Sequence, residues 1–281
     1  MIALTVAGLT LREAARRKVV WALLALTVVL LALSGWGFSK LIGLDTELGT
    51  LTSGEARLVA SMLLNLIMFG FSLIAAIGTA FLAGPTLSGE VESGQSLAML
   101  ARPVRRSSVL LGKWLGLLTF GCGYVVLAGL AQLLVVRGVV GYWPPSPAAG
   151  LALLAAETVA LLTLALLLSS VISPMASGIV AVGLFGATWV AGVVGGIGGA
   201  LGNEGVERVG SVSRVLLPTD GLWRGAMNAF QDPSALMQMG PEGGFPFLSD
   251  AAPTPVYLAW AAVWIAVVLG LTALSFQRRD I

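Results

Sequence analysis

The chain has 281 residues, of which 57% are hydrophobic and 11% are charged, and its net charge is +2. Soluble domains carry about 25% charged residues, so this composition excludes a water-soluble globule and predicts an all-α polytopic membrane protein. The weak net charge gives no indication of nucleic-acid binding. The lone Cys122 and the absence of histidine from the sequence exclude an internal disulfide and histidine-dependent catalysis.

An amphipathic helix is expected over residues 2–17, ahead of the first apolar run. Leu4 and Leu11 fall near one face, whereas Arg12 and Arg16 lie on the polar side. A helix of this kind lies in the membrane interface instead of crossing the bilayer. A plain helical extension of the first span is the alternative.

Six apolar runs are long enough to cross the hydrocarbon core, which takes roughly 20 residues. We therefore expect a single transmembrane domain, 1–281, with six transmembrane helices. The first run is longer than the apolar part of a signal peptide, so it predicts an uncleaved span. The runs cover about 19–38, 59–83, 110–136, 150–172, 178–201 and 256–276.

The basic residues predict how these spans are oriented. With the N-terminus inside, ten of the sixteen Lys and Arg residues lie on the inner side and six on the outer side. Short inner loops are enriched in these residues, so both termini are expected in the cytoplasm. The predicted location is the cell inner (cytoplasmic) membrane, where the chain passes through the lipid bilayer several times.

The outer-side segment 202–255 predicts short amphipathic helices before the last span. Apolar residues recur at helical spacing twice within it. Thr219 or Asp220 is expected to cap the second of these helices. Trp223 and Phe230 suit a position at the membrane interface.

The inner segment 84–109, between the second and third runs, is the most informative part of the sequence. It is charged and carries signals for short helices, including Ser88 with Glu90 and a chain break at Pro103. A structured inner platform suits the docking of a soluble partner. A solvated turn with positive-inside arginines is the alternative.

The segment 84–113 resembles the loop between the second and third spans of the type-2 ATP-binding cassette (ABC) exporter permeases. Their pattern is Ser-Gly-Glu, a second acid, Gly, a Leu-rich turn, Ala-Arg-Pro-Val, a basic residue and Leu-Gly-Lys. The N-terminal basic helix and the tail at 276–281 also agree, so the similarity in layout covers the whole chain. The matching residues are Ser88, Gly89, Glu90, Glu92, Gly94, Ala101, Arg102, Pro103, Val104, Arg105, Gly112 and Lys113.

The resemblance implies that this loop is a cytoplasmic coupling loop whose helix docks on a separate ABC ATPase subunit. It also implies that two ATPases bind a pair of permeases, which is a homodimer or includes a paralogous permease. Spans one, two and five would line the path between the two copies. The residues expected to dock on the ATPase are Ser88, Gly89, Glu90, Glu92, Gly94, Arg102, Pro103, Arg105, Arg106 and Lys113.

The sequence contains no ATPase motif of its own. A phosphate-binding loop needs Gly-x-x-x-x-Gly-Lys-Ser/Thr, but Lys113 is followed by Trp114 and no glycine stands at the upstream position. ATP and Mg are therefore expected on the partner ATPase. We expect no cofactor, metal site or catalytic residue in this chain.

Three polar residues inside the apolar runs are candidates for the translocation path: Asn65, Gln132 and Glu157. An intramembrane carboxylate is costly and marks a functional position, unless Glu157 reaches the interface or pairs with an arginine. The two amides are also typical of hydrogen bonds between helices.

The fifth run ends in glycines at four-residue spacing, Gly192 with Gly196 and Gly195 with Gly199. Such spacing permits close approach between helix backbones. It equally permits a hinge, and the sequence leaves both interpretations open.

The predicted function is that of a permease subunit exporting a hydrophobic or amphipathic substrate, driven by ATP hydrolysis in the separate ATPases. The alternative is a membrane scaffold or permease for a periplasmic maturation complex with an accessory protein, because some relatives serve maturation of nitrous-oxide reductase. A secondary carrier ranks last, because the sequence shows no convincing inverted repeat and Glu157 is the sole candidate proton group.

Overall fold

The computed structural model describes residues 2–41, 45–46, 49–50, 53–86, 106–234, 248–249 and 251–278. Within these ranges the regular structure is helical, apart from a short antiparallel pair of strands, β1 (Asp45–Thr46) and β2 (Gly49–Thr50). Six of the helices are long and apolar enough to cross a membrane. This confirms the prediction of an all-α polytopic membrane protein.

Each of the six membrane-spanning helices overlaps one apolar run, and most of them extend beyond it. The third is the clearest case, because polar residues at both ends continue the helix past the apolar stretch. The fourth helix begins and ends three residues earlier than its run, since residues 170–172 form a turn before Pro174 starts the next helix. The spanning helices are α2 (Lys18–Leu41), α3 (Ser53–Gly84), α6 (Arg106–Val140), α7 (Pro147–Ser169), α8 (Pro174–Ala200) and α12 (Pro255–Arg278).

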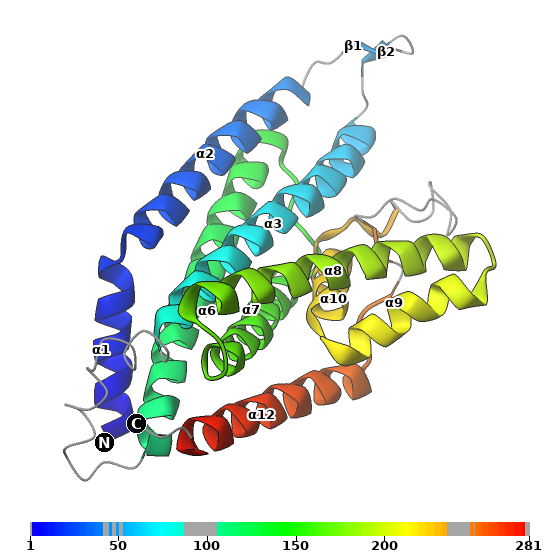
Figure 1. Cartoon of the computed structure of the whole chain (residues 1–281). Helices are drawn as coiled ribbons and strands as arrows, with labels where there is room; N and C mark the ends of the chain where they lie inside the picture. The colour runs from blue at the N-terminus through cyan, green and yellow to red at the C-terminus, as the bar shows by residue number, and fades with distance from the viewer. Residues whose placement is uncertain are drawn as a thin grey trace.

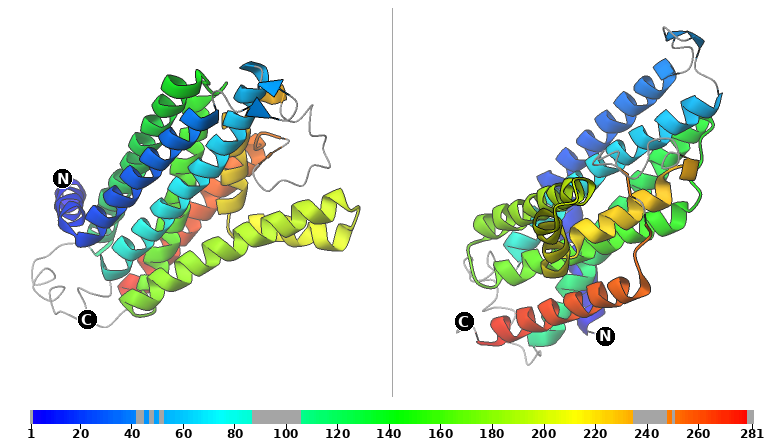
Figure 2. Two further views of the ribbon diagram at one scale, coloured as in Figure 1. Left: turned by 90° about the horizontal axis from the view of Figure 1, so that it is seen from above. Right: turned by 90° about the vertical axis from the view of Figure 1, so that its right-hand side faces the viewer.

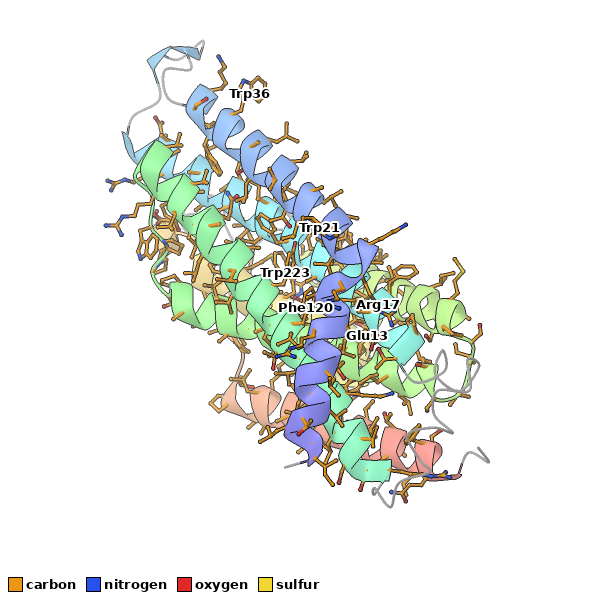
Figure 3. All side chains as sticks on the ribbon, turned by 90° about the vertical axis from the view of Figure 1, so that its left-hand side faces the viewer. Glu13, Arg17, Trp21, Trp36, Phe120 and Trp223 are labelled. Carbon is orange, nitrogen blue, oxygen red and sulfur yellow. The ribbon has the colours of Figure 1, made fainter. Side chains whose placement is uncertain are left out.

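Helix α1 (Ile2–Arg16) is a separate helix that packs along the first half of α6. Figure 3 shows it beside α6, below α2, with Glu13 and Arg17 near its C-terminal end. Glycine in α6 permits the close approach: a Cβ atom on Gly116 would lie 2.6 Å from the backbone oxygen of Ala7. The predicted amphipathic helix therefore has a protein-facing side as well as a polar one.

The hydrophobic core surrounds α3 and α7, the two spanning helices with the largest buried share. Near the middle of the molecule, Met68 of α3 and Leu154 of α7 pack with Phe230 from a later helix. Towards the end of α3, a second cluster joins Leu82 with Leu161 and residues of α1, α6 and α8. The core therefore extends along most of the length of α3.

Helices α8 and α9 (Glu204–Leu216) form a helical hairpin in which α9 runs back alongside α8 (Figures 1 and 2). Gly195 permits the contact, because a Cβ there would lie 2.6 Å from the Cα of Gly210 in α9. The Asn203 side chain caps α9 by accepting hydrogen bonds from the backbone N–H groups of Gly205 and Val206. In this structure α8 continues unbroken through its glycines, which serve close approach.

Helix α10 (Thr219–Phe230) packs its apolar face into the protein core. Trp223 and Phe230, which were expected to suit the membrane interface, are 1% and 0% exposed and therefore face the protein core instead of lipid. The predicted cap is wrong. Pro218 occupies the N-cap position and no side chain caps the helix, since the hydroxyl of Thr219 bonds to that of Thr188 instead.

The N-terminal end of α1, the start of α6 and the C-terminal end of α12 lie at one end of the molecule (Figures 1 and 2). The end of α3 and the start of α6 flank the segment 87–105, which lies outside the described residues. We call this part the loop end and define it by residues 84–86, 106–113, 169 and 277.

Candidate functional site

The last turn of α3 is held at the loop end by side chains from two other helices. The Nζ of Lys113 in α6 donates a hydrogen bond to the carbonyl oxygen of Thr86 at 2.7 Å. The Oγ of Ser169, the last residue of α7, donates to the carbonyl oxygen of Gly84 at 2.6 Å. The final carbonyls of a helix lack partners within it, so these two donors satisfy groups that would otherwise need water.

The first residue of α6 connects the loop end to the last helix. Nη1 of Arg106 donates a hydrogen bond of 3.3 Å to the carbonyl oxygen of Gln277 in α12. A basic side chain near a helix C-terminus also interacts favourably with the helix dipole. Together with the two bonds at the end of α3, this contact joins four helices, α3, α6, α7 and α12, around the edges of the loop.

Most of the residues predicted to dock on an ATPase lie outside the described residues, so their docking stays a prediction. The structure describes two of the predicted set, Arg106 and Lys113. Lys113 is only 3% exposed and uses its ammonium group on Thr86. Its observed contribution is therefore to position one edge of the loop. The predicted docking residues outside the description are Ser88, Gly89, Glu90, Glu92, Gly94, Arg102, Pro103 and Arg105.

Glu157, the predicted path residue in α7, is 3% exposed. Its Oε2 accepts a hydrogen bond of 3.0 Å from the Oγ of Ser72 in α3. Within the described ranges, Glu157 makes no ion pair with an arginine, and its burial shows that it does not extend to the surface of the chain. A role in a translocation path stays a prediction for this residue.

The two amide residues of the predicted path make hydrogen bonds between helices. Oε1 of Gln132 in α6 accepts from the Oγ of Ser34 in α2 at 2.8 Å. Nδ2 of Asn65 in α3 donates to the carbonyl oxygen of Met227 in α10 at 3.5 Å. Both side chains are buried within the single chain and connect neighbouring helices, as polar residues in membrane helices commonly do.

Comparison with known protein families gives a match over nearly the whole chain. The family model described as ABC-2 family transporter protein matches residues 4–281. The chain belongs to the ABC-2 transporter family. A comparison with curated proteins finds no significant match.

Membership of the ABC-2 family defines the kind of component that this chain is. The ABC-2 domain is the transmembrane part of an ABC transporter and implies a separate ABC ATPase as its partner. The match includes the segment 84–113, on which the resemblance was based. In an ABC-2 permease, the loop end is therefore the part of the described structure nearest the segment expected to meet the ATPase.

The ABC-2 permease also contains a partly buried charged cluster that the sequence did not predict. Oδ2 of Asp220 in α10 accepts from Nε of Arg214 at 2.9 Å and from Nε of Arg224 at 3.1 Å. The four-residue spacing of Asp220 and Arg224 was a visible signal for one pair. The second pair crosses the turn between α9 and α10, so local spacing gave no indication of it.

Proposed function

We propose that this ABC-2 family chain is the permease subunit of an exporter for a hydrophobic or amphipathic substrate. ATP hydrolysis in separate ATPase subunits, which bind ATP and Mg, would drive it through contacts with the segment 84–113. The observation that carries the proposal is the set of hydrogen bonds at the loop end. Lys113, Ser169 and Arg106 connect both edges of the predicted coupling loop to other helices.

These bonds give a route by which movement of the loop would reach the spans. The edges of the loop continue directly into α3 and α6, two long helices, and the side-chain bonds extend the connection to α7 and α12. Helices behave as rigid elements in such transitions, so a displacement at the loop would tilt whole helices. A solvated turn without such bonds would absorb the displacement locally.

The outer face of α2 supports assembly around a shared path. Trp21, Val28 and Leu33 are large apolar residues of α2 that the single chain leaves exposed. Figure 3 shows Trp21 and Trp36 pointing away from the helix bundle. This face suits contact with lipid or with a second permease copy, identical or paralogous. In the proposed arrangement α2, α3 and α8 of two copies enclose the path, and two ATPases bind.

The proposal includes an orientation in the membrane. The loop end would face the cytoplasm, because the positive-inside rule assigns Arg12, Arg16 and Arg106 to that side. The outer side would then hold the β1–β2 hairpin, α9 and α10. Both termini would be cytoplasmic, and the membrane would be the cell inner membrane.

The test is co-purification of the chain with an ATPase encoded nearby. The double variant Glu90→Lys/Glu92→Lys is expected to abolish the complex, because charged groups set the register and specificity of an interface. Glu204→Lys is the matched control, since Glu204 lies in α9 on the proposed outer side, and it should assemble normally. Unchanged assembly and ATP hydrolysis in the double variant would contradict docking through this loop.

A second measurement separates export from a scaffold role. The assembled complex is reconstituted in lipid vesicles and screened with hydrophobic and amphipathic compounds for stimulated ATP hydrolysis and uptake into inverted vesicles. Stimulation with uptake supports export. An assembled, active complex that moves none of them, yet binds a periplasmic accessory protein, favours the scaffold.

A further inference from the structure

Two neighbouring cavities flank α10 and the start of α12, one on the side of α7 and the other on the side of α8 and α9. The first has a volume of about 640 Å³ and a mostly apolar lining that includes Ala152, Leu153 and Leu258. The second, of about 480 Å³, is lined by polar groups that include Arg214 and Arg224. Both volumes are typical of small-molecule sites. Gly225 and Pro253 line both cavities, so the two are adjacent.

The polar cavity presents two partly buried arginines beside one buried carboxylate. Arg214 and Arg224 share a single carboxylate, because both Nε atoms donate to Oδ2 of Asp220. Nη2 of Arg224 donates to the carbonyl oxygen of Gly192 at 2.6 Å. Among the residues that the structure describes, no acceptor is found for Nη1 of Arg224 or for either Nη of Arg214. The other acid of the lining, Glu207, is exposed to solvent.

The two arginines are held in place by the surrounding backbone and side chains. Asp220, which positions both guanidinium groups, has a side chain only 1% exposed. The hydroxyl of Tyr257 donates to the carbonyl oxygens of Arg214 and Pro218 at 3.3 Å and 3.1 Å. The guanidinium donors are therefore preorganised for an anionic group. Arginine is well suited to phosphate, because its planar fork can donate two parallel hydrogen bonds.

Aromatic residues at the same junction indicate its depth in the membrane. Nε1 of Trp260 donates to the carbonyl oxygen of Val215, and Nε1 of Trp264 donates to that of Leu216. Both carbonyls are at the end of α9, close in sequence to Arg214. Trp and Tyr side chains of this kind are enriched at membrane–water interfaces, where the charged headgroups of lipids lie.

We propose that the two cavities bind one amphiphile with an anionic, phosphate-like headgroup. The headgroup would meet Arg214 and Arg224 in the polar cavity, and the hydrocarbon chain would lie in the adjacent apolar cavity, crossing over the outer side of the contact between Gly225 and Pro253. This proposal concerns binding alone and does not depend on ATP-driven transport.

The test uses the full chain in phosphatidylcholine nanodiscs and an alkyl phosphate with a diazirine at the end of its chain. After irradiation, mass spectrometry should locate the label on peptides that line the apolar cavity. Unlabelled dodecyl phosphate should compete, whereas inorganic phosphate and dodecyl maltoside at equal concentration should not. Equal competition by inorganic phosphate would overturn the amphiphile proposal in favour of a soluble anion. Equal competition by dodecyl maltoside would overturn the role of the headgroup.

Two variants with matched controls test each cavity separately. Arg214→Gln should reduce labelling about tenfold, because a charge-assisted hydrogen bond to the headgroup is lost. Arg208→Gln, on an exposed arginine of the same helix, should label normally. Ala152→Phe should exclude the chain from the apolar cavity, whereas Ala148→Phe, outside its lining, should not. Equal labelling of Arg214→Gln and Arg208→Gln would overturn the proposal. If a variant does not fold, the competition series on the unmodified chain tests the proposal instead.

Discussion

The ammonium group of Lys113 and the carbonyl oxygen of Thr86 are joined by a buried hydrogen bond of 2.7 Å across a sequence separation of 27 residues. All of the predicted coupling loop after Thr86 lies between these two residues. A buried ammonium is tolerated only where acceptors meet it, so this bond is a strong local constraint. It connects the end of α3 to α6 at the place where the loop begins.

Lys113→Met should loosen this connection. The change removes the donor and leaves the Thr86 carbonyl without it, which costs about 1–3 kcal/mol of stability. We expect a lower melting temperature for the purified chain and weaker substrate stimulation of ATP hydrolysis in the assembled transporter. Lys40→Met is the control, because Lys40 is an exposed lysine in the last turn of a different helix, α2. Equal behaviour of the two variants would show that the bond has no mechanical role.

Gly116→Ala should separate α1 from α6. The added Cβ would lie 2.6 Å from the backbone oxygen of Ala7, so α1 must shift, and overpacking of this kind costs about 1–3 kcal/mol. At Gly123 in the same helix an added Cβ meets open space, so Gly123→Ala should stabilise the chain slightly. Thermal unfolding compares the two variants, and limited proteolysis reports release of α1. An unchanged cleavage pattern in Gly116→Ala would contradict the expected shift.

The bond between Ser72 and Glu157 should contribute a small coupling energy. A double-mutant cycle with Ser72→Ala and Glu157→Ala is expected to give about 0.6 kcal/mol, the average for hydrogen bonds between membrane helices. The measurement is reversible unfolding of the four proteins in mixed micelles. A coupling energy of zero would mean that the two side chains are not bonded. Glu157→Gln, which keeps an acceptor for Ser72, should unfold like the unmodified chain.

Asp220→Asn should be among the more destabilising single changes in the chain. It leaves Arg214 and Arg224, whose side chains are 30% and 20% exposed, without their shared carboxylate, and losing hydrogen bonds to a charged group costs about 1.5–3 kcal/mol. Glu204→Gln is the control, because the pair of Glu204 with Arg208 is exposed and such pairs contribute little. Thermal unfolding of the purified variants distinguishes them. A small decrease in the melting temperature of Asp220→Asn, similar to that of the control, would refute a structural role for the cluster.

Tyr142 should make the stability of the chain depend on pH in the alkaline range. Its hydroxyl donates to the carbonyl oxygen of Phe230 at 2.7 Å, and burial raises the pKa of Tyr142, with Asp232 adding to the effect. In the unfolded chain the phenol ionises near its ordinary pKa of about 10. The stability that the buried, neutral phenol of Tyr142 contributes to the folded chain is therefore fully present below that pH and is lost as the pH rises further.

Tyr142→Phe tests this dependence. The variant should be about 1 kcal/mol less stable at neutral pH and should lose less stability than the unmodified chain above pH ~10. Spectrophotometric titration of the tyrosines gives the ionisation of Tyr142 as the difference between the two proteins. Ionisation of Tyr142 at the ordinary pKa in the folded chain would contradict the prediction.

The sequence by itself determined the class of the protein and the positions of its spans. Six apolar runs of spanning length leave few other folds open, because a backbone in lipid must satisfy its own hydrogen bonds. The motif from Ser88 to Lys113 also indicated the ABC-2 family from residue order alone. The family comparison confirms this, since it matches residues 4–281.

Only the tertiary structure decided which polar groups meet. Thr86 follows the end of α3 whereas Lys113 lies in α6, and Ser72 and Glu157 lie in different helices, 85 residues apart. Helical periodicity gives the face of a helix on which a side chain lies but not the neighbouring helix that this face meets. The glycines of α8 left a hinge and a close approach equally open until α9 was found against Gly195.

Trp223 shows the same limit for apolar faces. Its spacing in α10 identified an apolar side correctly, yet that side packs against other helices of the protein instead of lipid. Lipid tails and the side chains of neighbouring helices are equally apolar, so hydrophobic periodicity cannot distinguish them. The sequence determined that this is a membrane protein and to which family it belongs. Packing between the helices decided which of its faces meet each other.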